Sequence, residues 1–145
     1  MDYKKAGSDI YIRMDKGEKL VESILSVCQK EHILGGHFQG IGACDTATIS
    51  TYIPEKQDFI HHTLSGMLEM ISLMGNVSID PEGRPHIHSH TVFSWLKENG
   101  GVAVTAGHLK EARIGYTGEI VLHTSGMKIG RMFDYHAGID VWDMQ

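Results

Sequence analysis

Histidines at alternate positions are the residues of this sequence best suited to chemistry. His86, His88 and His90 are separated by single residues, Ile87 and Ser89. Side chains at alternate positions of a β-strand point to the same face, so a strand here would carry a row of three imidazoles. Neutral imidazole is a common ligand of zinc and other divalent transition metals. The spacing therefore predicts a metal-binding face.

A further histidine follows in the next predicted strand. Residues 86–95 and 102–109 are expected to form a hairpin about the turn at 98–101, so that His108 comes opposite His86 or His88. Three protein ligands and an open fourth position are typical of catalytic zinc, and the open position would hold water or a small anion. The alternative is a polar row of histidines without any metal.

Other motifs in the sequence point less clearly to chemistry. Water on zinc ionises near neutral pH, so hydrolysis of a small substrate is one hypothesis, with Glu119 considered as its acid or base. Nothing in the sequence places Glu119 near the histidines. A glycine pair, Gly40 and Gly42, begins like a dinucleotide-binding fingerprint, but the third glycine and the following helix are absent. Structural or surface roles are expected for the remaining histidines: His32, His37, His61, His62, His123 and His136.

The elements that must position these residues are mostly strands. One helix is expected, beginning at a capping box formed by Asp15 and Glu18 and ending at Gly35 and Gly36. Glycines at 40 and 42 indicate a bulge or bend in a long strand. A turn is expected at 80–83. Strands are expected at 8–14, 37–53, 59–64, 66–79 (where a short helix is the alternative), 86–95, 102–109, 114–117 and 119–124, before a final segment at 131–142.

Composition limits the classes of protein to consider. The 145 residues are 41% hydrophobic and 21% charged, as expected for one globular domain. No apolar run is long enough to cross a bilayer and no signal peptide is evident, which predicts a cytoplasmic protein without a membrane partner. The two cysteines, Cys28 and Cys44, are expected to be buried thiols. A net charge of −5 disfavours binding to nucleic acid.

Five short segments, taken in order, resemble the plants-and-prokaryotes-conserved (PPC) domain. The ordered set of His-x-His, then Gly-His-Leu, then Glu-Ile-Val-Leu is the most specific part of the resemblance, which covers almost the whole chain. The segments are Gly40-Ile41-Gly42-Ala43, Leu73-Met74-Gly75-Asn76, Pro85-His86-Ile87-His88, Gly107-His108-Leu109 and Glu119-Ile120-Val121-Leu122.

The resemblance implies an α/β fold of the α+β type, with a central, mostly antiparallel β-sheet flanked by helices and assembled as a homotrimer. It also implies that His86, His88 and His108 are the metal-associated histidines. Two departures are His90, which adds a third histidine to the usual pair, and Ala106, where the family more often has glycine. The number of histidine ligands is therefore undecided by one residue.

Three functions follow from these observations. The first is a trimeric protein that binds zinc, or another divalent metal, and holds a small molecule or a protein partner at the ion. The second is a DNA-associated regulator, because plant members of the family carry AT-hooks beside this domain; here Gly83-Arg84-Pro85 matches an AT-hook core but is expected to form a turn. The third is the zinc hydrolase.

Overall fold

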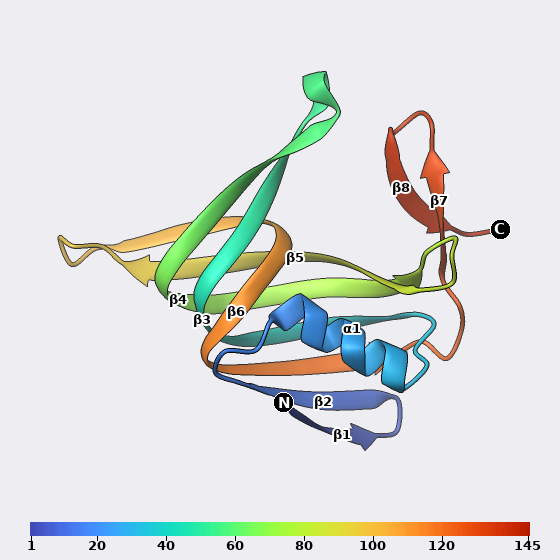
Figure 1. Cartoon of the computed structure of the whole chain (residues 1–145), viewed down its shortest axis with the longest axis horizontal. Coiled ribbons are helices and arrows are strands. Elements are labelled where there is room, and N and C mark those ends of the chain that lie inside the picture. The colour runs from blue at the N-terminus through green and yellow to red at the C-terminus, as the bar shows by residue number, and fades with distance from the viewer.

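The structure, a computed structural model, describes residues 1–145 and consists mainly of β-strands with one α-helix (Figure 1). The expectation of a sheet flanked by several helices is therefore wrong. The elements are β1 (Asp2–Ala6), β2 (Asp9–Asp15), α1 (Leu20–Lys30), β3 (Gly36–Ile53), a 3₁₀ turn (Pro54–Lys56), β4 (Asp58–Ile79), β5 (Pro85–Leu96), β6 (Val102–Thr124), β7 (Gly130–Asp134) and β8 (Ile139–Asp143).

The sheet contains a closed circuit of four strands. β3 pairs with β4 and β6, and β5 also pairs with β4 and β6, so each of these strands has two neighbours. All pairings are antiparallel except the one between Ile79 of β4 and Gly130 of β7. The mostly antiparallel sheet predicted from the sequence is confirmed.

The glycines of the long strands confirm one predicted bulge and explain two strand boundaries that were predicted wrongly. The pairing of β3 shifts register between Gly40 and Gly42, as the predicted bulge requires. The breaks expected at Gly66 and Gly118 are absent, because β4 and β6 continue through them, and the helix considered for residues 66–79 does not form. A Cβ on Gly118 would lie 2.9 Å from Cδ1 of Ile114, so this glycine allows close packing and does not form a turn.

The helix starts later than the capping box predicts. The Glu18 carboxylate accepts a hydrogen bond from the backbone N–H of Asp15 at 2.7 Å, but α1 begins at Leu20. The free N–H groups of its first turn are bound by a residue distant in sequence: Glu111 accepts from Val21 N at 2.8 Å and from Glu22 N at 3.2 Å. A strand carboxylate thus caps the helix and fixes it to β6.

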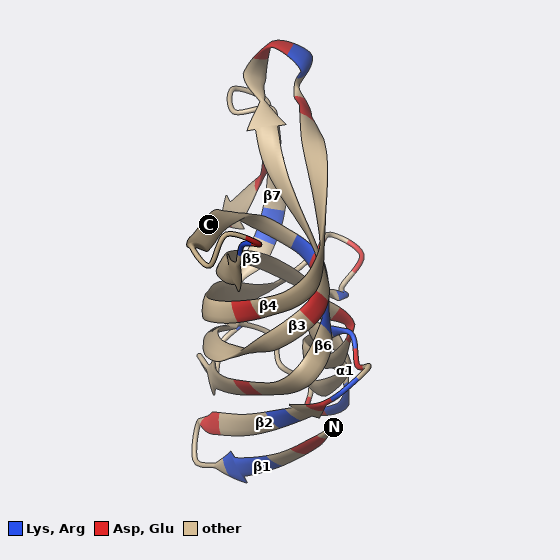
Figure 2. Cartoon of the chain, turned by 90° about the vertical axis from the view of Figure 1, so that its left-hand side faces the viewer, with Lys and Arg blue, Asp and Glu red and all other residues tan.

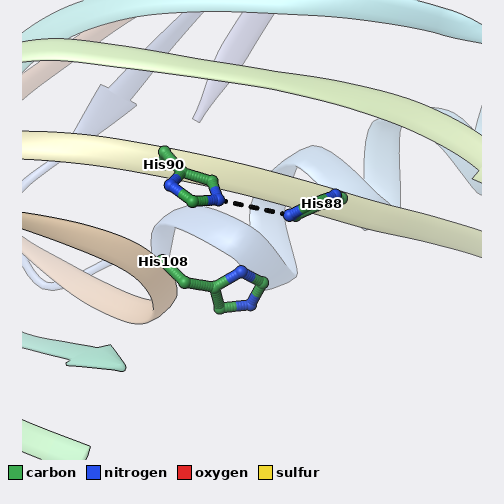
Figure 3. Close-up of side chains that lie close together, drawn as sticks. All are labelled: His88, His90 and His108. Carbon is green, nitrogen blue, oxygen red and sulfur yellow. Dashed lines mark hydrogen bonds between the residues drawn. The ribbon is translucent and has the colours of Figure 1, made fainter. Parts of the chain in front are cut away.

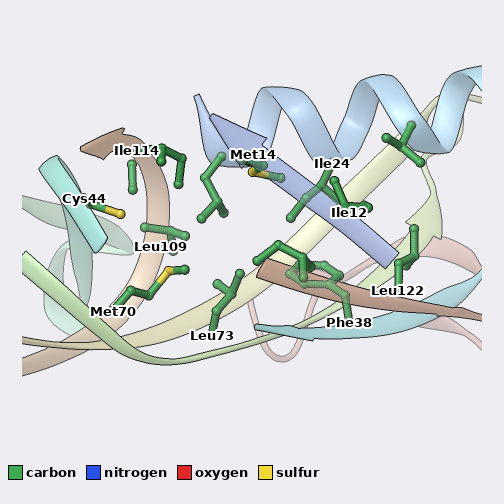
Figure 4. Packing of buried hydrophobic residues seen from close by; sticks show 14 of the residues in the cluster. Ile12, Met14, Ile24, Phe38, Cys44, Met70, Leu73, Leu109, Ile114 and Leu122 are labelled. Atoms are coloured by element: carbon green, nitrogen blue, oxygen red, sulfur yellow. The ribbon is translucent and has the colours of Figure 1, made fainter. Parts of the chain in front are cut away.

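The core lies between α1 and the inward side of the strands and is one cluster of 22 buried residues. Figure 4 shows part of it, with Ile24 of α1 beside Ile12 and Met14 of β2. Both cysteines are buried there, as predicted, and burial raises the pKa of the Cys28 and Cys44 thiols to about 12. These thiols stay protonated at neutral pH and are unsuited to nucleophilic chemistry.

No helix in the structure is both long enough and apolar enough to cross a membrane.

Replacing Glu111 by alanine should destabilise the fold by about 1 kcal/mol, the usual cost of losing a helix N-cap. Two backbone N–H groups would lose their partner, and water would replace it at the partly buried helix end. Urea denaturation measures the change. Glu98→Ala, in the exposed turn between β5 and β6, is the matched control. Equal stability of the two variants would contradict the capping role.

Candidate metal site

The histidine row lies on the outer face of β5, as its spacing predicts. Ser89 and Thr91 point into the protein and are 2% exposed, whereas His86 and His88 are half-buried and His90 is exposed. Hydrogen bonding to β4 and β6 on either side holds β5 in this orientation. The sheet pairing therefore keeps the three imidazoles on one surface.

The hairpin register differs from the predicted one by at least two residues. Leu96 pairs with Val102 across a loop of residues 97–101, which places His108 directly opposite His90. The expectation that His108 faces His86 or His88 is thus wrong in register, because pairing His108 with His88 would require the hairpin to be centred on Glu98, whereas its centre is Asn99.

His88, His90 and His108 form a compact group at this point (Figure 3). Each offers a ring nitrogen, and these nitrogens all lie within 4.8 Å of one another. The Nε2 atoms of His88 and His90 are 3.2 Å apart. The ring centroids of His88 and His108 are separated by 5.1 Å. His86 precedes His88 by two residues on the same strand and is not part of this group.

Burial and mutual proximity disfavour charge on two members of the group, His88 and His108. Burial, followed by the charges of His108 and His90, lowers the pKa of His88 to about 4. Burial also lowers the pKa of His108, with a contribution from His90. Both rings are therefore neutral at pH 7, and neutral imidazole is the form that binds a metal ion.

The donor set fits a borderline-soft divalent ion. Three imidazole nitrogens from His88, His90 and His108 suit zinc, which usually has four ligands, so one position would remain for another group. Bound zinc would supply a Lewis acid and could lower the pKa of a water molecule. No carboxylate belongs to the group, in contrast to the acid or base considered from the sequence.

Glu119 is placed elsewhere on the sheet. It pairs with Arg13 of β2 and Ile41 of β3 and lines a groove on the outer face of these strands. Two of the remaining histidines also make local contacts: His123 Nδ1 lies 2.7 Å from Asp9 Oδ1, and His61 Nδ1 lies 2.8 Å from Ser50 Oγ. These contacts suit the structural roles expected of them.

Several polar residues beside the histidines were missed by the sequence analysis. On β4, Asn76 pairs with His88 and Ser78 pairs with His86. The Oδ1 atom of Asn76 is buried without a hydrogen-bond partner. Arg131 of β7 donates to Ser78 Oγ at 3.3 Å. The polar residues at alternate positions 76 and 78 could have indicated a polar face on β4. No local pattern in the sequence indicates that Arg131 lies beside it.

Comparison with known proteins identifies the chain's relatives. Residues 1–125 match the family model described as the Plants and Prokaryotes Conserved (PCC) domain, the family abbreviated PPC above. Among curated proteins, no sequence matches the chain.

Solved structures give the same result. A metal-containing protein of Archaeoglobus fulgidus is 30% identical, with a TM-score of 0.82 and coverage of 98% of both chains. A plant- and prokaryote-conserved protein of Pyrococcus horikoshii is also 30% identical, with a TM-score of 0.81 over 99% of this chain and 94% of that one. A Bacteroides thetaiotaomicron protein, provisionally described as DNA-binding, is 25% identical, with a TM-score of 0.89 over 98% and 96% of the two chains. The chain belongs to the plants-and-prokaryotes-conserved domain family.

Proposed function

We propose that this protein binds a divalent transition metal ion, zinc above others, through the histidines of the β5–β6 hairpin. The observation that carries the proposal is the convergence of His88, His90 and His108, whose ring nitrogens lie within 4.8 Å of one another. The Archaeoglobus relative, described as metal-containing, adds support. His86, implied as a ligand by the family resemblance, remains the alternative third member of the set.

The proposed role of the ion is to hold a small molecule or a protein partner at its remaining position. Three histidine ligands leave such a position on a four-coordinate ion. The group lies at the surface, with His90 exposed, so a ligand can approach from solvent. Hydrolysis is a weaker proposal, because no carboxylate stands in the group to act as acid or base. The proposed location is the cytoplasm, where the two free thiols would stay reduced.

Homotrimer formation is the second part of the proposal. A groove of about 730 Å³ crosses the outer face of the sheet and is lined by residues of β1 to β4 and β6. Several of its apolar side chains are about half exposed, including Tyr11 at 53%, Ile41 at 57% and Ile71 at 52%. Contiguous apolar surface of this kind is typical of a protein interface, and the family resemblance makes further copies of the chain the expected partner.

DNA binding is a second candidate function, favoured by the provisional description of the Bacteroides relative. The charge distribution supports it poorly. Lysine and arginine residues are scattered among acidic residues along the strands (Figure 2), and the net charge is −5. Of the AT-hook-like residues, Gly83 lies in the predicted turn and Pro85 begins β5, while Arg84 between them binds Asp80 and Glu82. These contacts occupy the arginine that would enter a minor groove.

Metal content tests the main proposal. Wild-type protein, purified without a His tag, should contain close to one zinc or other transition-metal ion per chain by elemental mass spectrometry. His88→Ala and His108→Ala should each weaken metal binding. Loss of a residue that only hydrogen-bonds to a metal ligand already weakens metal affinity by roughly 10- to 100-fold, so loss of a ligand itself should weaken it more. His90→Ala should weaken it more than His86→Ala if the structural group is the ligand set.

His136→Ala, in the exposed turn between β7 and β8, serves as the control for histidine removal. It should leave the metal content unchanged. Absence of metal from reconstituted wild-type protein, or full retention in both His88→Ala and His108→Ala, would refute the proposed site.

Assembly is tested by substitution in the groove. Light scattering should give three times the chain mass of 16.1 kDa for wild-type protein and a smaller mass for Ile41→Glu. The Ile41 side chain is 57% exposed, so a charge there disturbs an interface and leaves the fold of one chain intact. Leu96→Glu, at a residue that is 74% exposed outside the groove, should assemble normally. A monomeric wild type would contradict the proposal.

DNA binding is tested by electrophoretic shift on an A·T-rich duplex at low salt. No shift is expected at micromolar protein, because the chain carries a net charge of −5. A shift that disappears as salt is raised would instead favour the second candidate.

A further inference from the structure

The C-terminal hairpin supplies a residue to the histidine site from outside the matched family domain. The family match ends at residue 125, whereas β7 and β8 span Gly130–Asp134 and Ile139–Asp143. β7 joins the sheet beside the end of β4, where the N–H of Ile79 donates to Ile129 O at 2.8 Å. This attachment brings the next residues of β7 to the polar end of β4.

Arg131 differs from the other three arginines in its surroundings. Arg13, Arg84 and Arg113 are more than half exposed, and each forms an ion pair with a carboxylate. Arg131 is partly buried and has no carboxylate within 4.0 Å. Its Nη1 donates to Ser78 Oγ at 3.3 Å and its Nη2 to the backbone oxygen of Asp140 at 2.8 Å. Its Nε–H is buried without a partner.

The nearby carboxylate of Asp140 acts on the Arg131 charge but lies beyond ion-pair distance, so this partly buried guanidinium is incompletely compensated. Arginine cannot release its proton in a protein, so the cost of removing the charge from water is not avoided by neutralisation. Its two neutral acceptors, a hydroxyl and a carbonyl oxygen, compensate the charge less well than an anion does. The guanidinium would therefore be stabilised by a hydrogen bond to a carboxylate or phosphate oxygen.

The position of Arg131 relates it directly to the histidines. Ser78, its hydrogen-bond partner, lies opposite His86, and Asn76, two residues along the same face of β4, lies opposite His88. Opposite side chains on paired strands have Cβ atoms about 5 Å apart, and one step of two residues along a strand spans roughly 7 Å. A ligand only a few atoms long would reach from the Arg131 guanidinium to the histidine group.

We propose that Arg131 recognises the anionic group of the ligand that binds at the histidine site, so that this ligand is a small carboxylate or phosphate compound. The inference rests on the proposed metal-binding function. The ligand would contact the ion at His88, His90 and His108 and the guanidinium at its other end. Asn76, which pairs with His88 on the neighbouring strand, lies on the same face of β4 as Ser78, the residue that binds the guanidinium.

Calorimetry with defined anions tests this inference. Zinc-loaded wild-type protein is titrated with inorganic phosphate and, separately, with succinate, against chloride at equal ionic strength. The stronger of the two responses identifies the anion class. Arg131→Gln should weaken binding of that anion by roughly 10- to 100-fold, the range for a lost charge-assisted hydrogen bond, at unchanged zinc content.

Two further variants separate recognition from a structural role of the arginine. Arg131→Lys keeps the charge and the tie to β4, and should recover part of the affinity. Lys128→Gln removes an exposed positive charge just before β7 and should bind the anion as wild type does. Thermal unfolding of all variants shows whether the hairpin is kept in place.

Zinc content measured on the same samples separates failure of this inference from failure of the proposed function. Zinc bound at one ion per chain, with equal anion affinity in wild type and Arg131→Gln or with no anion binding at millimolar concentration, overturns the inference alone. Absence of zinc and of every other transition metal overturns the proposed function. The titrations on zinc-free protein then decide the inference: binding that Arg131→Gln loses supports an anion site, and no binding overturns it.

Discussion

Closure of the four-strand circuit is the constraint on which the rest of the structure depends. Because β3, β4, β5 and β6 each pair with two of the others, none of them can slide without breaking two sets of hydrogen bonds. A shift of one residue would also exchange the two faces of a strand. On β5 it would turn His88 inward and expose Phe93, which is fully buried. Burial of the core and exposure of the histidines are therefore fixed by the same pairing.

The electrostatics of the histidine group follow from that pairing. Rings that neighbouring strands hold within contact distance cannot all carry a proton, because like charges repel and the half-buried setting penalises charge. The pKa of His88, lowered to about 4, expresses both effects. At neutral pH the strands thus present unprotonated nitrogen atoms at a fixed spacing. Unprotonated nitrogen atoms at a fixed spacing would bind a cation without losing protons or reorganising, which is consistent with the proposed metal-binding role.

The sequence predicts features that depend on local pattern and fails where distant residues decide. The histidine row, the bulge at Gly40 and Gly42, and the buried cysteines follow from alternation and residue type. The register of His108 does not, because it depends on how many residues the loop after Leu96 contains. The strand break expected between residues 117 and 119 does not form, because glycine suits both turns and close packing and Gly118 lies within β6. The cap of α1 was unpredictable, since Glu111 is separated from Val21 by 90 positions.

Arg131 is likewise brought to the proposed site by pairing between distant segments, which no local pattern in the sequence indicates. Its position also separates metal binding from ligand recognition, which a family resemblance does not distinguish. The proposed histidine ligands lie within residues 1–125, the part of the chain that matches the family. The guanidinium comes from a hairpin beyond that match, attached to β4 through Ile79 and Ser78. The proposed ion site and the proposed anion contact therefore come from different parts of the chain, and the solved structures compared above match 98–99% of the chain, so both parts are included. Similarity of fold alone does not decide whether a relative has the arginine as well as the histidines.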